Sequence, residues 1–258
     1  MILALVSFIC FFTSYGCSPS TSPNNLSRTN SYEITNIKNV IDGDTILLND
    51  GRKIRYIGMD TPELSINEQK KYAEEALNVN QNLLNNKKIE MQYDSVKNDI
   101  YGRTLAYVYA DNIMVNIELV RRGYALVYTF PPNVKHFKEF ISGQKFARNN
   151  KKGLWNNETL LPIDHTEADK YIGKLCTVKG KVIEVYEGTK VILLNFDKNY
   201  KTDFTILIYK NNLSLFYSEG IDPLKYYINK NVVTYGWIEE YNGPEIKVDN
   251  PFQIEVTD

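Results

Sequence analysis

The chain has 258 residues, of which 43% are hydrophobic and 24% charged, so it can bury one large core or two smaller ones and is not a disordered chain. Its formal net charge of −1 argues against a protein that coats nucleic acid through excess positive charge. The charge is uneven, because residues 35–157 hold 18 Lys and Arg against 14 Asp and Glu, whereas residues 166–258 hold 11 against 14. A polyanionic partner would therefore favour the first segment.

The first sixteen residues carry no charged side chain, and residues 2–12 are almost wholly apolar. A membrane-spanning helix needs about 20 apolar residues, so this run is more typical of a secretory signal. Small residues and Cys17 follow, as in a bacterial lipoprotein signal, in which the cysteine carries lipid and becomes the mature N-terminus. The run lacks a preceding Lys or Arg and the Leu usual three residues before such a cysteine, so plain secretion is the alternative.

We therefore expect a signal peptide over residues 1–16 and a flexible tether over residues 17–32, which are rich in Ser, Asn, Thr and Pro. The mature protein would be an extracytoplasmic, membrane-anchored lipoprotein. Cys176 would then be the only cysteine besides the lipidated one, so no internal disulfide is expected. Its apolar neighbours predict a buried position in a strand.

The next segment, residues 33–157, is predicted to form one domain. Its first strand is expected over residues 32–41, and two short β-rich runs flank Asn49-Asp50-Gly51. Asp-Gly between such runs favours a hairpin, because both turn positions tolerate a positive φ. Apolar periodicity predicts further strands at residues 88–93 and 103–109 and helices at residues 67–86, 112–122 and 133–150.

Polar residues and a proline then predict a linker over residues 158–169. A second β-rich segment, residues 170–258, contains five predicted strands and a helix inserted between the third and the fourth. This order favours a small OB-like β-barrel, of the oligonucleotide- and oligosaccharide-binding type. The strands are expected over residues 174–185, 190–196, 204–209, 231–239 and 245–256, and the helix begins at residue 212.

Two clusters of acidic residues flank the predicted hairpin. Asp42 and Asp44 surround a glycine, and Asp60 and Glu63 surround Thr61-Pro62. Clustered carboxylates raise one another's pKa, and a cation that neutralises them relieves this cost. A set of oxygen ligands suits Ca²⁺ or Mg²⁺ better than zinc. The alternative is that these are common turn sequences whose acids are solvated.

Two arginines strengthen the case for a phosphate site. Arg55 lies within the hairpin, and Arg103 follows a tight turn at the head of a strand. A metal ion and a guanidinium can hold a phosphodiester oxygen from two directions. The set of acids and arginines is therefore suited to phosphodiester hydrolysis.

Four motifs in order carry a specific resemblance. They are Val40-IDGDT-Ile46, Arg55 five residues before Asp60-Thr-Pro-Glu63, Asp99-IYGR-Thr104, and Gly153-Leu-Trp155. Over roughly residues 34–157 the sequence resembles the thermonuclease, or staphylococcal-nuclease-like, family. The resemblance implies a mainly β fold with α-helices, in which an OB-like five-stranded barrel carries three helices and a single Ca²⁺.

The resemblance also implies roles for particular residues. Asp44 and Asp60 would supply carboxylate ligands to Ca²⁺, and Thr61 a backbone carbonyl. Glu63 would orient or deprotonate the attacking water, while Arg55 and Arg103 would hold the phosphate. Asp42 would lie near the site without being a direct ligand.

Two aromatic positions match family residues that border the nucleotide, namely Tyr101 and Tyr128. The family usually has a second tyrosine two residues beyond Tyr128, where this chain has Phe130. Phenylalanine can still stack on a base, but a hydroxyl contact to the substrate is lost.

These observations predict a secreted or membrane-anchored, calcium-dependent nuclease that acts on DNA and/or RNA. We expect it to be a monomer without an obligate protein partner. The alternative is a catalytically inactive lipoprotein that binds nucleic acid or protein. Every expected catalytic residue lies no later than Arg103, so a chain ending near Asn157 is expected to cleave. Aromatic residues of the second segment (Phe196, Phe204 and Tyr209) could stack on bases, but its net charge of −3 favours a core position for most of them.

Overall fold

The computed structural model describes residues 32–199 and 203–257. The expected signal peptide, Cys17 and nearly all of the expected tether lie outside these ranges, so they remain predictions from sequence. In the described part of the chain, no helix is both long and apolar enough to cross a membrane.

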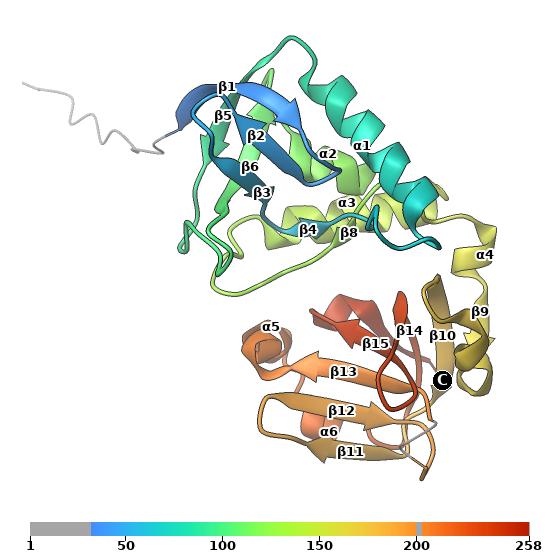
Figure 1. The fold of residues 1–258 in the computed structure, drawn as a ribbon. Helices are drawn as coiled ribbons and strands as arrows, with labels where there is room; N and C mark the ends of the chain where they lie inside the picture. The colour runs from blue at the N-terminus through green and yellow to red at the C-terminus, as the bar shows by residue number, and fades with distance from the viewer. Residues whose placement is uncertain (1–31, 200–202, 258) are drawn as a thin grey trace, which may run out of the picture. The chain divides into compact units, whose positions relative to one another are not determined.

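Five strands of the first segment close into a barrel (Figure 1). They follow the order β3-β2-β1-β5-β6, and β3 also pairs with β6 in parallel, which joins the two ends of the sheet. The expected hairpin is present, since β2 and β3 pair antiparallel and Gly51 adopts a φ of 91°. The strands are β1 (Glu33–Val40), β2 (Thr45–Leu48), β3 (Lys53–Tyr56), β5 (Lys88–Gln92) and β6 (Thr104–Ala110).

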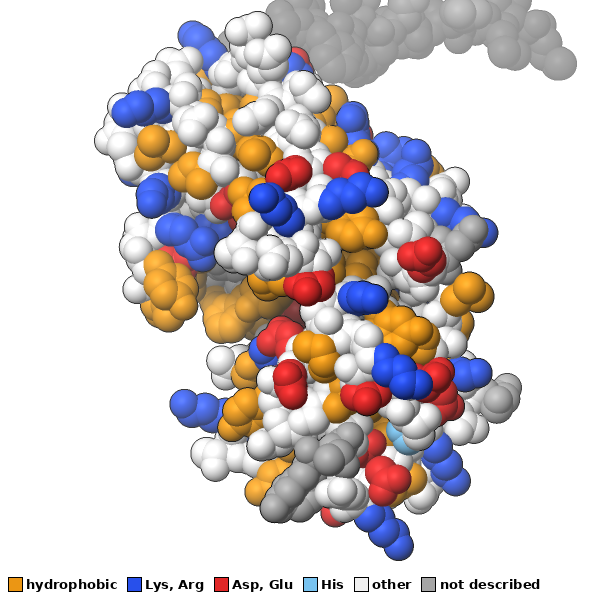
Figure 2. Space-filling view, turned by 45° about the vertical axis from the view of Figure 1, so that its right-hand side comes forward, with side chains coloured by type: hydrophobic (Ala, Val, Ile, Leu, Met, Phe, Trp, Pro, Cys, Tyr) orange, Lys and Arg blue, Asp and Glu red, His pale blue; other side chains and the backbone are white. Residues whose placement is uncertain are grey.

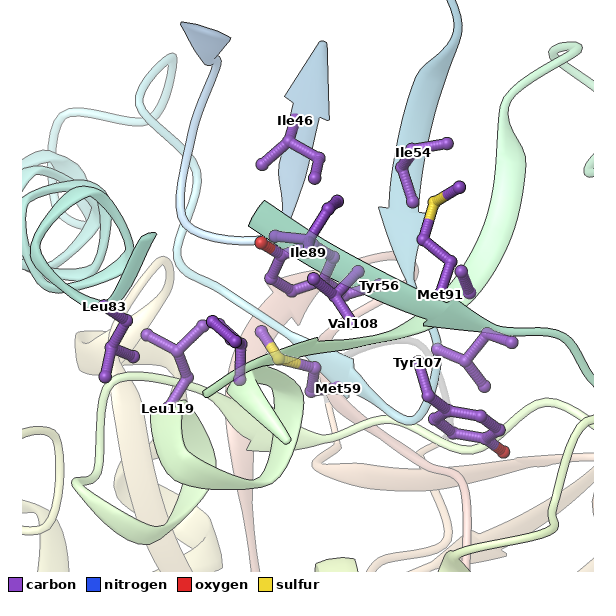
Figure 3. Packing of buried hydrophobic residues seen from close by; sticks show 14 of the residues in the cluster. Ile46, Ile54, Tyr56, Met59, Leu83, Ile89, Met91, Tyr107, Val108 and Leu119 are labelled. Atoms are coloured by element: carbon purple, nitrogen blue, oxygen red, sulfur yellow. The ribbon is translucent and has the colours of Figure 1, made fainter. Parts of the chain in front are cut away.

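Three helices accompany this barrel, as the sequence predicts: α1 (Lys70–Leu84), α2 (Val115–Arg121) and α3 (Phe137–Asn149). A short β7 (Ile113–Met114) precedes α2 and pairs with β6. Apolar side chains from the strands and helices meet inside the barrel, as in β-barrels of this size. Figure 3 shows Ile46, Ile54, Tyr56, Met59, Leu83, Ile89, Met91, Tyr107, Val108 and Leu119 in this core.

A separate ribbon of two short strands lies outside the barrel sheet. It pairs β4 (Met59–Asp60) with β8 (Leu126–Val127) in antiparallel register. The sequence analysis predicted neither strand, because each is only two residues long. The ribbon carries Asp60, one of the expected metal ligands.

The stretch expected to be a linker has regular structure. It contains α4 (Asn157–Leu160), β9 (Pro162–Asp164) and the 3₁₀ helix η1 (His165–Tyr171). Strand β9 pairs in parallel with β10 (Leu175–Lys181), and the Thr177 hydroxyl donates to the Thr159 carbonyl at 2.6 Å. Pairing with the following sheet orders a segment whose own sequence shows no periodicity.

The second segment forms a sheet with the same cyclic strand order as the first barrel. Strands β10 and β11 are separated by two residues and can be counted as one strand. The OB-like order then runs from this strand through β12, β13 and β15 to β14. Within it, β13 and β15 pair in parallel. Strand β14 also pairs with β10, which closes the circuit. The remaining elements are β11 (Glu184–Glu187), β12 (Val191–Asn195), β13 (Thr205–Tyr209), η2 (Lys210–Asn212), α5 (Leu213–Ser218), α6 (Pro223–Tyr226), β14 (Asn231–Glu240), β15 (Pro244–Val248), η3 (Pro251–Gln253) and β16 (Ile254–Thr257).

The aromatic residues of this second barrel divide between core and surface. Phe196 and Phe204 are buried and pack together with ring centroids 5.1 Å apart, so the expectation of a core position is confirmed for both. Tyr209 is partly exposed. Cys176 is a buried, free cysteine in β10, as its neighbours predicted.

A third apolar cluster joins residues of the two barrels. Leu126, Ala147, Leu154 and Trp155 of the first segment pack with Leu175 and Tyr235 of the second. The Gly-Leu-Trp motif therefore ends the first segment within a shared core. On the face drawn in Figure 2, Lys and Arg side chains are interspersed with Asp and Glu.

Candidate active site

The β2–β3 hairpin brings Asp44 and Arg55 together. Its register pairs Thr45 with Arg55, which places Asp44 beside the end of β3, and the Tyr56 N–H donates to the Asp44 carbonyl at 2.9 Å. The Arg55 Nε lies 3.2 Å from the Asp44 Oδ1, and its Nη2 donates to the Asp60 Oδ1. Arg55 thus joins the start of β2 to the end of β4.

Backbone carbonyls fix the guanidinium in this position. The Arg55 Nη1 donates to the carbonyls of Tyr56, at 2.8 Å, and Met59, at 2.9 Å. The Arg55 side chain is only 11% exposed, so these bonds and the two carboxylates replace most of its hydration. The guanidinium therefore has little conformational freedom and forms a cation at a fixed position.

Asp44 is also tied to the loop that follows β4. Its Oδ2 accepts hydrogen bonds from the Thr61 N–H at 3.0 Å and the Thr61 hydroxyl at 2.8 Å, and its Oδ1 accepts from the Thr45 hydroxyl at 3.0 Å. The structure therefore brings Asp44, Asp60 and Thr61 together around Arg55.

The acids outnumber the cation in this cluster. Burial, followed by the charge of Asp44, raises the pKa of Asp42 to about 6. Burial raises the pKa of Asp60 to about 7; Arg55 opposes this rise, and the charges of Asp44 and Glu63 add to it. The Asp60 side chain is 43% exposed, so water reaches the cluster from its side. One arginine thus leaves an excess of negative charge.

Glu63 is exposed on the loop between β4 and α1. The side chain of Gln69 accepts a hydrogen bond from the Glu63 N–H at 2.8 Å. Gln69 is buried just before the first residue of α1, so the helix start holds the loop backbone while the Glu63 carboxylate stays open to solvent. The negative charge of Glu63 contributes to the raised pKa of Asp60.

Arg103 lies at the head of β6, which pairs in parallel with β3 so that Thr104 lies opposite Ile54. Its Nε donates to the Asp99 Oδ2 at 2.6 Å, and its N–H to the Asp99 Oδ1 at 2.9 Å. The structure therefore places Arg103 on the strand next to that of Arg55, paired with an acid of its own turn. In this state it is not part of the Arg55 ion-pair cluster.

The two expected nucleotide-bordering tyrosines are both accessible. Tyr101 is 78% exposed, and its ring lies 5.6 Å from the Arg103 guanidinium carbon. Tyr128 directly follows β8, donates its N–H to the Gly58 carbonyl at 3.1 Å and is 41% exposed. Phe130 is also exposed, so aromatic faces remain available on this side of the barrel.

Sequence reasoning missed two residues that shape the site. Asn80, fully buried in α1, donates to the carbonyls of Asp42 and Gly43 and accepts from the Tyr56 hydroxyl at 3.0 Å. It therefore holds the loop that carries both acids. A buried Asn on an otherwise apolar helix face is the only signal that could have suggested it.

The other missed residue is Asp249, which follows β15 in the second barrel. Burial raises its pKa to about 8, and the charge of Asp60 adds to the rise. Burial also raises the pKa of Tyr128 to about 12, with further contributions from the charges of Asp249 and Asp60. The second barrel thus places a carboxyl group within electrostatic reach of the site, which no local motif could indicate.

The donor set fits a hard cation. It offers the carboxylates of Asp44 and Asp60, with the Thr61 backbone hydrogen-bonded to Asp44, so its donors are oxygens in a cluster with an excess of negative charge. In the two described ranges, no three His, Cys, Asp or Glu side chains come close enough together to hold a metal by themselves. A cation here would therefore rely on two acids, a carbonyl and water, which is a usual coordination for Ca²⁺ or Mg²⁺.

Comparison with known proteins agrees with this geometry. The model of the family described as staphylococcal nuclease homologue matches residues 53–157. The chain is 39% identical over 123 residues to a thermonuclease of Staphylococcus hyicus, covering 46% of this chain and 73% of that protein. It is 37% identical to a thermonuclease of Staphylococcus intermedius, over 46% of this chain and 74% of that protein, and 37% identical to endonuclease YncB of Bacillus subtilis (strain 168), over 45% and 58%. With its closed five-stranded barrel, the chain belongs to the staphylococcal nuclease homologue family.

Proposed function

We propose that this protein is a calcium-dependent nuclease that hydrolyses phosphodiester bonds of DNA and/or RNA. The observation that carries the proposal is Arg55, a buried guanidinium that bridges Asp44 and Asp60. A protein without a binding site here would gain little from burying the Arg55 guanidinium and the Asp44 carboxylate beside Asp60, because the desolvation of charged groups is costly. A site that must hold both a cation and a phosphate needs this arrangement.

Asp44, Asp60 and the Thr61 carbonyl are the proposed ligands of Ca²⁺. When bound, the ion would polarise a phosphate oxygen as a Lewis acid and offset the excess negative charge of the acids. Asp44 is prepared for this role because three hydrogen bonds from Thr45 and Thr61 hold its carboxylate in place. Mg²⁺ demands a tighter octahedral geometry and is expected to support the reaction poorly.

The remaining residues act on the substrate. Glu63, exposed and unconstrained at its carboxylate, accepts the proton of the attacking water. Arg55 and Arg103 donate hydrogen bonds to the phosphate oxygens, on which negative charge increases in the transition state. Arg103 would exchange its partner Asp99 for the substrate, and the rings of Tyr101 and Tyr128 would border the nucleotide.

A non-catalytic module that binds nucleic acid or protein is the competing function. Digestion of single-stranded DNA and of RNA by the purified protein, with Ca²⁺ and then with excess chelator, separates the two. We expect cleavage with Ca²⁺, its loss in chelator and its recovery when Ca²⁺ is restored. Full cleavage in chelator would exclude the calcium requirement, and binding without cleavage would favour the module.

A matched pair of variants tests whether Glu63 is the general base. Glu63→Gln should lower turnover by about 10²-fold or more, within the range usual for general-base catalysis. Glu74→Gln changes another exposed glutamate, on α1, and should leave turnover unchanged. Equal turnover for both variants would remove Glu63 from the mechanism.

We further propose that the protein acts as a monomer outside the cytoplasm, anchored through a lipid on Cys17. The support is the sequence of the first 32 residues, in which an apolar run precedes the cysteine and a polar tether follows it. Cys17→Ser should release the protein from membranes on fractionation, whereas a variant that stays bound would contradict lipid anchoring.

A further inference from the structure

The strand that carries Asp60 has little support of its own. Strand β4 is two residues long and, among the described residues, pairs only with β8, which is equally short, in the register Met59 to Val127 and Asp60 to Leu126. An isolated two-stranded ribbon is marginally stable in water. Arg55 holds the Met59 carbonyl and the Asp60 carboxylate from one side, so the position of Asp60 depends on Arg55 and on what holds β8.

A side-chain link holds β8 from its other edge. The Val127 N–H donates to the Gln144 Oε1 at 2.7 Å, and the Gln144 Nε2 donates to the Tyr235 hydroxyl at 2.7 Å. Gln144 lies on α3 and is almost fully buried, so both ends of its amide are committed. Tyr235 belongs to β14 of the second barrel, 91 residues away in sequence.

An apolar contact reaches the same strand. Leu126, opposite Asp60 in the ribbon, packs in the shared cluster with Trp155 and Tyr235. The Tyr235 ring meets Trp155 edge to face at a centroid distance of 5.1 Å, and the Arg148 guanidinium carbon lies 4.3 Å from its centroid. Tyr235 of the second barrel is thus linked to both residues of β8, to Leu126 through the shared apolar cluster and to Val127 through Gln144.

We propose that the second barrel is a brace for the metal site and that Tyr235 and Gln144 are positioning residues for Asp60. The proposal rests on the proposed function, because it assigns a role toward the cation that Asp60 would bind. A ligand held in place before binding loses less conformational entropy when the ion arrives, so the brace raises calcium affinity. The barrel without this brace would still contain its catalytic residues but would need more calcium.

Tyr235→Phe in the full chain tests the brace with a minimal change. The ring remains packed on Trp155, while the buried Gln144 Nε2 loses its acceptor. We expect the calcium dissociation constant, measured by calorimetry, to rise about tenfold, at the lower end of the roughly 10- to 100-fold range for residues that support metal ligands. The loss of cleavage at limiting calcium should clearly exceed the loss at saturating calcium.

Amide hydrogen exchange gives a readout that does not depend on calcium or activity. Exchange at Val127 should become several-fold faster in Tyr235→Phe, because the Gln144 side chain that covers this amide is released. The control is Tyr241→Phe, which removes an exposed hydroxyl just after the same strand and should match the wild type in exchange and calcium affinity. Wild-type values for Tyr235→Phe in both measurements would overturn the brace.

Gln144→Met provides a second test at similar side-chain volume. It removes the acceptor for Val127 as well, so its effect on exchange should be larger, and adding Tyr235→Phe to it should change little, since the link is already broken. Additive effects would show that the two residues act separately and would contradict the proposal. If the wild type binds no calcium, the proposed function fails, while the exchange measurements still decide whether Tyr235 holds β8.

Discussion

The two barrels use the same cyclic order of five strands, yet their corresponding positions carry different chemistry. In the first barrel the Tyr56 N–H donates to the Asp44 carbonyl at 2.9 Å, just outside the β2–β3 pairing. In the second, the Lys210 N–H donates to the Lys190 carbonyl at 2.9 Å, just outside the β12–β13 pairing. Lys190 thus stands where the first barrel has Asp44.

The same correspondence places Tyr209 of the second barrel where the first has Arg55, since Tyr209 pairs with Val191 as Arg55 pairs with Thr45. The acid and the arginine that meet in the first barrel are therefore replaced by a lysine and a tyrosine. The same barrel fold can therefore carry different side chains at one strand end, and these side chains, rather than the fold, determine whether a charged site is present. The second barrel instead supplies a contact to the first, through Tyr235 and Gln144.

The largest expected effect lies at Arg55. Arg55→Lys should lower kcat/KM by about 10²–10³-fold, because a lysine keeps the charge but loses the planar fork that contacts two carboxylates and would contact phosphate. Steady-state cleavage of single-stranded DNA measures this, after circular dichroism has established folding. Lys190→Ala in the corresponding region of the second barrel is the control and should stay within about twofold of the wild type. Near-normal cleavage by Arg55→Lys would leave Arg55 a structural cation.

Substitutions in the two barrels should differ in how they affect the stabilisation of the protein by calcium. At free calcium 100-fold above its dissociation constant, a ligand specific to the native state contributes about 2.7 kcal/mol, so the melting temperature should rise. Asp44→Asn should abolish the rise because it removes a carboxylate ligand, whereas Lys190→Gln should keep it. Differential scanning calorimetry with calcium and with chelator gives both values. An undiminished rise in Asp44→Asn would place the ion elsewhere.

A matched pair of glycines separates stability from activity. A Cβ on Gly43 would lie 2.6 Å from the Thr61 Cγ2 and 2.8 Å from the Ala76 Cβ, and one on Gly180 would lie 2.6 Å from the Phe196 Cδ1. Both alanine variants should lose about 1–3 kcal/mol of unfolding free energy through overpacking. Only Gly43→Ala should also lower activity at a temperature where both are folded, because it displaces Thr61 from Asp44. Equal residual activities would mean that the acidic loop tolerates displacement.

The smallest expected effect is a pH dependence in the absence of metal. The native pKa of Asp60 is raised to about 7, so its contribution to stability is present at low pH and is lost as pH rises through about 7. Asp60→Asn should therefore gain a few degrees in melting temperature relative to the wild type between pH 5 and pH 8, measured in chelator. The partial exposure of Asp60 limits the size of this gain. A difference that stays constant with pH would show that Asp60 titrates normally, and Glu74→Gln is the control.

Much of the fold could be read from local patterns. Alternating apolar residues predicted the principal strands of both barrels, and Asp50-Gly51 predicted the hairpin whose register places Asp44 beside Arg55. The three helices of the first barrel also follow from their periodicity, with ends within a few residues of those observed. The ribbon β4–β8 was missed, because a pairing of two residues leaves no periodic signal.

The sequence by itself determined which acids and arginines this chain has and that the hairpin brings Asp44 near Arg55, because that relation depends on spacing along neighbouring segments. Only the tertiary structure decided that Arg55 bridges Asp44 and Asp60, that Arg103 pairs with Asp99, and that Tyr235 reaches β8 through Gln144. The last contact joins side chains 91 residues apart, and nothing in either segment signals the other. Such contacts arise when two separately patterned barrels bury a common surface, so packing alone selects them.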